Sequence, residues 1–163
     1  MSDYRHRGGA SLSFRFAASF FAALALEFAP WGEWLLARKP IFPALALVFW
    51  CIYHPRLGGY AAAVIVGIAT DLAAQTPLGF HAFSYVVMVF AASRLRGRFA
   101  LLGSAAAAVH VCFILATAQF ALYFLGFFDE GLPELTWRRF YPSIVGALLW
   151  WALSIIYARG RGR

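Results

Sequence analysis

Six long apolar runs, separated by proline and by charge, constrain this chain more than any other feature. Proline and charged clusters end helices, and all seven prolines fall near the ends of runs, so the boundaries can be assigned from the sequence. The pattern predicts an all-α fold. The expected helices cover residues 12–29, 41–53, 58–76, 79–93, 99–126 and 141–158.

The composition places these helices in a membrane. Hydrophobic residues make up 63% of the chain and charged residues 13%, whereas a soluble domain is about half apolar and a quarter charged. A span takes about 20 residues, so 163 residues give about six spans and no room for a second domain. We therefore predict one transmembrane domain over 1–163, a polytopic integral membrane protein with short cytoplasmic tails. Soluble enzymes, solenoids and secreted disulfide scaffolds are excluded.

Two of the six runs leave the span count open. The runs at 41–53 and 79–93 are shorter than the roughly 17–25 residues of a typical span, so five spans are also compatible with hydropathy. The first run follows Arg5, Arg7 and Arg15, but Ala25 to Phe28 is a poor cleavage site for a signal peptide. We expect this run to be a retained helix.

The basic residues indicate the orientation. With six spans, ten of the 14 lysines and arginines fall on one side and four on the other: Arg38, Lys39, Arg138 and Arg139. The positive-inside rule then puts both termini in the cytoplasm. Because the net charge of +7 is spread over such short clusters, it does not indicate nucleic-acid binding.

The two longest exterior connections are rich in tryptophan. They hold Trp31, Trp34 and Trp137, and amphipathic rings of this kind sit at headgroup depth. We interpret these residues as membrane anchors. The alternative is that the loops present a surface to a periplasmic partner.

Asp71 is the one acidic residue deep inside an apolar run, and a carboxylate in the bilayer marks a functional or tightly paired position. Steps of four place small residues before it and a polar residue after it on one helix face. These residues are Gly59, Ala63, Gly67, Asp71 and Gln75. Because such small residues let a second helix approach closely, we interpret Asp71 as a hydrogen-bonded link beneath a helix crossing. A transport or catalytic role is the alternative.

Three further polar features accompany Asp71. His81 follows at the exterior start of the next helix and is near enough to reach Asp71. Gly103, His110 and Thr117 recur every seven residues, which predicts a polar seam between helices. Arg94, Arg96 and Arg98 form the strongest cytoplasmic cluster, which we expect to contact anionic lipid headgroups, with an acidic partner protein as the alternative.

No catalytic or metal-binding pattern is evident. Membrane hydrolases need two acids or a metal cluster to activate water, and the other two aspartates, Asp3 and Asp129, belong to a tail and a loop. Cys51 and Cys112 lie in apolar runs and form no metal motif. We therefore expect neither an enzyme nor a bound cofactor.

The segment from Pro43 to His81 resembles the rod shape-determining protein MreD family. It carries a proline that opens a short helix, an aromatic pair before a proline-containing turn, a Gly-x-x-x-Asp-Leu helix and then Leu-Gly. The matching positions are Pro43, Trp50, Tyr53, Pro55, Gly58, Gly67, Asp71, Leu78 and Gly79. The resemblance implies that Pro43, Gly67, Asp71 and Gly79 define the fold or contact a partner.

The same resemblance implies a cellular role, partners and a fold. It describes a noncatalytic inner-membrane component of the cell-elongation machinery that works with the bitopic protein MreC, the actin-like MreB, and a RodA-type glycosyltransferase with its transpeptidase. It also implies a fold similar to the six-helix substrate-binding subunits of energy-coupling-factor vitamin transporters. We therefore predict a membrane scaffold that organises peptidoglycan synthesis and cell shape.

Two rival functions are kept. A vitamin-binding subunit of an importer predicts an exterior polar pocket between Asp71, Gln75, His81 and the 127–140 loop. An intramembrane hydrolase predicts that Asp71 is the reacting group. We call the helix face of Gly59, Ala63, Gly67, Asp71 and Gln75 the small-residue ridge. The sequence leaves three candidates for what it packs against: the rest of the monomer, a second copy, or a partner helix.

Overall fold

The computed structural model describes residues 4–32, 39–99, 101–130 and 137–161. Every regular element in these ranges is helical, which confirms the all-α prediction for this part of the chain. Six α-helices lie at the six predicted places, with a short 3-10 helix, η1, before the last. Their bounds are α1 Tyr4–Glu27, α3 Phe42–Tyr53, α4 Tyr60–Ala74, α5 Phe80–Phe99, α6 Ser104–Glu130, η1 Trp137–Phe140 and α7 Tyr141–Arg161.

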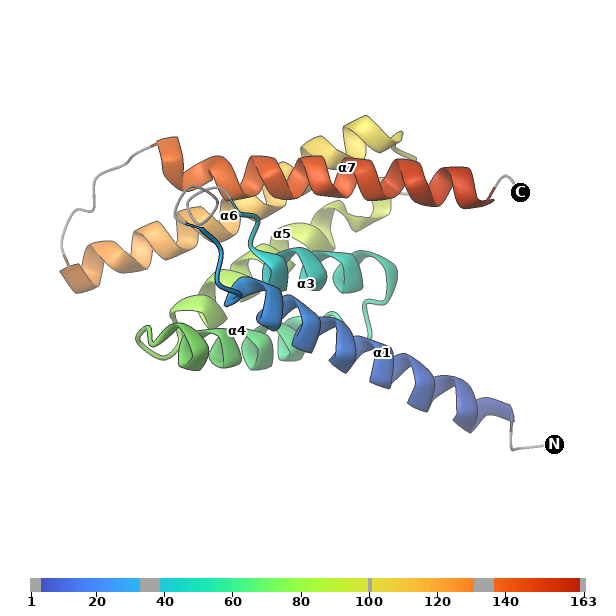
Figure 1. Ribbon diagram of the computed structural model, residues 1–163, viewed down its shortest axis with the longest axis horizontal. Helices are drawn as coiled ribbons and strands as arrows, with labels where there is room; N and C mark the ends of the chain where they lie inside the picture. Colours follow the sequence, from blue (N-terminus) through green and yellow to red (C-terminus); the bar gives the residue numbers. More distant parts are fainter. Residues whose placement is uncertain (1–3, 33–38, 100, 131–136, 162–163) are drawn as a thin grey trace.

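The helices form an up-and-down bundle around the short helix α3. Helix α3 contacts α1, α4, α5 and α6, while α7 packs on α6 along the other side. Successive helices run in opposite directions, so both ends of the chain emerge at the same end of the bundle (Figure 1). We call this the terminal end and the opposite one the loop end.

Helix α3 sits in the middle because it is apolar on every side. Leu47 and Val48 are fully buried, and they pack in one core with Tyr85 and Met88 of α5 and Ile114 of α6. The indole N–H of Trp50 donates to the hydroxyl of Ser19 on α1, 2.8 Å away. Pro43, also buried, occupies the first turn of α3, where its missing N–H leaves no helical hydrogen bond unmade.

The helix ends differ from the predicted ones where arginine is involved. Helix α1 begins at Tyr4 and α5 continues to Phe99, because arginine is a good helix former and its long side chain extends away from the apolar surface. The prediction began the first helix after Arg7 and ended the other before Arg94. Helix α4 is shorter than predicted, since Gln75 turns into the left-handed region with φ 55°.

One helix of the described part combines the length and the composition of a membrane span. It is the stretch Ser104–Phe127 of α6, while α3 and α4 are apolar but shorter. At about 1.5 Å per residue, the 12 residues of α3 reach about 18 Å, less than the roughly 30 Å of a bilayer core. Neighbouring helices surround α3, so much of its surface contacts protein.

Two glycines allow backbones to meet directly. A Cβ atom at Gly67 of α4 would lie 2.2 Å from Cα of Ala82 on α5, and one at Gly58 would lie 2.3 Å from the backbone nitrogen of Cys51. Ala63, one turn before Gly67, is also fully buried. At Gly67 the small-residue ridge therefore packs within the monomer, against the first turn of α5.

Replacing Gly67 with alanine tests this crossing. The added methyl group meets backbone that cannot rotate away, so α4 and α5 must separate, and we expect a loss of about 1–3 kcal/mol in the free energy of unfolding. The measurement is SDS titration in mixed micelles. Gly97→Ala is the matched control, because a Cβ at Gly97 meets nothing within 4 Å. Equal stability of the two variants would contradict a tight α4–α5 contact.

Candidate functional site

The candidate site is the junction between α4 and α5 at the loop end of the bundle. Helix α4 ends at Ala74, and the left-handed Gln75 lets the chain turn back. The backbone carbonyl of Asp71 accepts the N–H groups of Gln75 and Thr76, the latter at 3.1 Å. Pro77 follows and stops any further helix. This turn places the start of α5 directly beside the Asp71 side chain.

The Asp71 carboxylate is the centre of the junction. It is 0% exposed. Oδ2 accepts the N–H of Gly79 at 2.9 Å, and Oδ1 accepts the N–H of His81 at 2.9 Å. These are donors at the start of α5 that a helix cannot satisfy itself. A carboxylate at this place also complements the positive end of the helix dipole.

Two side chains complete the shell around Oδ1. The hydroxyl of Thr76 donates to it at 3.0 Å, and Nδ1 of His81 lies 2.7 Å away. Because an ionised carboxylate can only accept, Nδ1 is assigned as the protonated ring nitrogen. A carboxylate offers about four lone-pair positions, and these four hydrogen bonds engage both oxygens.

Gly79 has the backbone freedom that the junction requires. Its φ is +102°, a conformation that residues with a Cβ rarely adopt. In this conformation its N–H points at Asp71, while its carbonyl accepts the N–H of Phe83 in the first turn of α5. The Leu-Gly pair that the sequence analysis singled out therefore has a backbone role at Gly79.

A second acidic residue has the same role at the end of α1. Oε2 of Glu27 accepts the N–H of Phe42, the first residue of α3, at 3.0 Å. Oε1 lies 2.9 Å from Nζ of Lys39, which also donates to the Glu27 carbonyl. Each of these acids thus stands near the end of one helix and caps the start of the next.

The structure separates the predicted ridge into two parts. Ala63, Gly67 and Asp71 are buried, while Gly59 is the half-buried residue preceding α4. Gln75 was placed on the same face and this is wrong, because the helix ends before Gln75, whose side chain is exposed. Asp71 and His81 of the rival ligand pocket bond to each other, and residues 131–136 of its loop lie outside the described residues, so that pocket stays a prediction.

The predicted polar seam on α6 is also wrong. Nδ1 of His110 lies 2.8 Å from the carbonyl of Ala106, and the hydroxyl of Thr117 donates to the carbonyl of Ile114 at 2.7 Å. These bonds stay within α6, because a polar side chain in a helix readily reaches the carbonyl three or four residues earlier. Gly103 precedes the helix, and a Cβ there would meet open space.

The remaining predicted residues lie at the surface or outside the described ranges. Arg94, Arg96 and Arg98 are exposed at the terminal end of α5, and the guanidinium of Arg94 lies 5.0 Å from the ring centre of Phe90. Trp31 donates its indole N–H to the carbonyl of Leu26. Two of the predicted residues, Trp34 and Arg38, lie outside the described residues.

Sequence reasoning missed two capping residues, one at this junction and one at the end of α1. Thr76 was passed over, although a hydroxyl between a helix end and a proline is a common partner for a nearby carboxylate. The capping role of Glu27 was also not inferred from the sequence. Among the described residues, no three His, Cys, Asp or Glu side chains come together as a metal site.

Comparison with known proteins agrees with the resemblance seen in the sequence. A family model described as rod shape-determining protein MreD matches residues 10–159, which is most of the chain. No solved structure matches the chain. The expected likeness to vitamin-transporter subunits therefore stays a prediction.

Replacing Asp71 with asparagine separates a structural role from a catalytic one. The amide presents an NH2 group to donors and loses the charge, and a buried hydrogen bond to a charged group contributes about 1.5–3 kcal/mol. We expect the free energy of unfolding in mixed micelles to fall by at least that much. Gln75→Ala, at the exposed neighbour, should change stability by less than about 0.5 kcal/mol. A variant as stable as the parent would favour the hydrolase alternative.

Proposed function

The chain belongs to the rod shape-determining protein MreD family, whose members are membrane proteins with a role in cell shape, and on this premise we propose that it is a noncatalytic, multi-pass scaffold of the cell-elongation complex. Its task in this proposal is to hold the transmembrane helix of a bitopic, MreC-like partner beside the enzymes of peptidoglycan synthesis. MreB-like filaments and a RodA-type glycosyltransferase with its transpeptidase are the further partners.

The enclosed Asp71 carries the noncatalytic part of the proposal. A reacting carboxylate must touch substrate or water, whereas this one is 0% exposed and accepts four hydrogen bonds from its own chain. The energy of burying a charge in the bilayer is thereby offset within the fold. This geometry supports a role for Asp71 in fixing the shape of the α4–α5 pair.

The surface supports placement in a bilayer. Large apolar side chains point outward along the bundle, including Phe14 at 74%, Phe21 at 75% and Leu72 at 66% exposure. A soluble monomer rarely exposes so much apolar surface. The two termini and the arginine end of α5 share the terminal end of the bundle (Figure 1), which agrees with six spans and cytoplasmic termini.

A groove between α6 and α7 offers a place for a partner helix. We call it the alanine groove, and its volume is about 300 Å³. Its lining residues are Ala105, Ala108, Val109, Cys112, Ile144, Ala147, Leu148 and Trp151. Helices associate in membranes where small residues let their backbones approach. Its three alanines are small residues of this kind, and larger apolar side chains flank them.

Filling the alanine groove tests the scaffold function. Ala105 and Ala106 are both exposed near the start of α6, but only Ala105 lines the groove. Ala105→Phe should lower recovery of the MreC-like partner by about tenfold or more, since overpacking costs about 1–3 kcal/mol, and cells relying on this variant should become round. Ala106→Phe is the matched control and should keep both partner recovery and rod shape. Undiminished recovery with Ala105→Phe would reject this docking site.

A further inference from the structure

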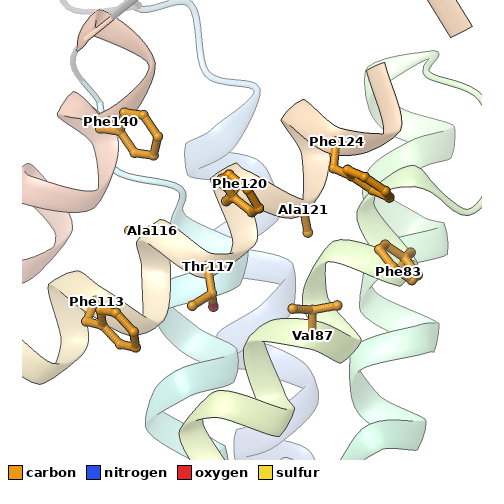
Figure 2. Close-up of a pocket in the computed structure, with 9 residues that line it drawn as sticks. All are labelled: Phe83, Val87, Phe113, Ala116, Thr117, Phe120, Ala121, Phe124 and Phe140. Carbon is orange, nitrogen blue, oxygen red and sulfur yellow. The ribbon is translucent and has the colours of Figure 1, made fainter. Parts of the chain in front are cut away.

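A second groove, between α5 and α6, differs from the first in being walled by phenylalanine. We call it the phenyl groove, and its volume is about 580 Å³. Figure 2 shows Phe83 and Phe124 on one side, and Phe113, Phe120 and Phe140 of η1 on the other. The wall is therefore built from three separate elements.

The floor of the phenyl groove presents only hydrocarbon. Ala116 and Ala121 are small, and the remaining floor residue, Thr117, turns its hydroxyl back to the carbonyl of Ile114 at 2.7 Å. None of the lining side chains is charged. A polar metabolite would find no hydrogen-bond partner here, since an unpaired polar group in an apolar site is costly. The occupant must itself be apolar along the groove.

The walls favour a flexible chain over a helix. Phe113 and Phe120 are 62% and 59% exposed, so their rings project beyond the floor. Such rings keep another helix backbone at a distance, whereas membrane helices pair through small residues. From Phe113 to Phe124 the groove runs about 16 Å along α6 at 1.5 Å per residue. This is about half of a 30 Å bilayer core, the depth of one leaflet.

Positive charge stands beside the phenyl groove. Phe140 lines the groove, and the two residues before it in η1 are the exposed Arg138 and Arg139. The guanidinium of Arg139 lies 5.7 Å from the ring centre of Tyr123 on α6, which holds the charge over the wall helix. The positive-inside rule gives no reason for an arginine pair on the exterior side. An anionic ligand at this point does.

We propose that the phenyl groove binds one anionic phospholipid of the outer leaflet, with an acyl chain between the phenylalanines and the phosphate at Arg138 and Arg139. The inference rests on the proposed placement in the membrane but not on any partner helix. The length and the apolar lining of the groove match an acyl chain, and the charge of the two arginines matches the phosphate. In this proposal the acyl chain occupies the phenyl groove between α5 and α6.

Native mass spectrometry of the purified full chain in mild detergent tests the headgroup contact. Phosphatidylglycerol and phosphatidylethanolamine are added in equal amounts, and the ratio of the two bound lipids is measured. We expect one phosphatidylglycerol to be retained in preference. In the double variant R138Q/R139Q that preference should fall by about fivefold for each arginine removed. The matched control R94Q/R96Q, which removes two exposed arginines from the other end of the bundle, should leave it unchanged.

A second pair of variants tests the chain contact. Phe120→Ala should reduce the total lipid retained while leaving the preference between headgroups as it was. Phe21→Ala, which removes an outward phenylalanine of α1 at 75% exposure, should retain lipid as the parent does. Glycerol 3-phosphate, which has the headgroup charge without acyl chains, should not displace the lipid. Thermal melting of every variant in detergent confirms that each is folded when compared.

Several results would overturn the proposal. Equal retention of both lipids by the parent would remove the charge argument, and loss of preference in R94Q/R96Q would move the site to the other leaflet. Displacement by glycerol 3-phosphate would show a phosphate site without a chain. These outcomes leave recovery of the bitopic partner untouched, so they are distinguishable from failure of the scaffold function.

Discussion

One carboxylate sets the geometry of the loop end of this bundle. Asp71 closes α4 onto the first turn of α5 through the N–H groups of Gly79 and His81. The contact of Gly67 with Ala82 follows, since α5 can begin so near α4 only if its orphan donors are satisfied there. The direction that α5 then takes also places Phe83 and Val87 beside α6, where they form one side of the phenyl groove. The buried hydrogen bonds of Asp71 between α4 and α5 thus influence the shape of the groove between α5 and α6.

Much of this junction could be predicted because burying a charge is so unfavourable that its surroundings are constrained. Asp71, Gly67 and His81 were identified together, since an acid amid small residues needs donors and close neighbours. Gln75 was misplaced because the four-residue step was carried past the point where the helix ends. The seam through His110 failed for another reason, because its polar atoms bond to carbonyls of α6 itself. Periodicity shows which residues share a face but not how each polar atom is satisfied.

The two grooves were beyond sequence reasoning because each is formed by helices that meet only in the fold. The alanine groove joins α6 to α7, and the phenyl groove joins α6 to α5 and η1. Their linings differ in size but not in polarity, so hydropathy treats them alike. In a bilayer this difference of shape decides what can be held, because small residues admit a backbone while standing rings admit a flexible chain. One helix, α6, therefore contributes to two sites of different selectivity.

The paired caps at Glu27 and Asp71 bear on how the chain enters the membrane. Each acid lies near the end of one helix and accepts hydrogen bonds from backbone N–H groups at the beginning of the following segment. A lone α4 would carry an unsatisfied anion into hydrocarbon, whereas α4 with the first turn of α5 carries a closed set of hydrogen bonds. We therefore expect α4 and α5 to insert into the membrane together, as a helical hairpin. The start of α5 must then be synthesised before α4 can settle in the bilayer.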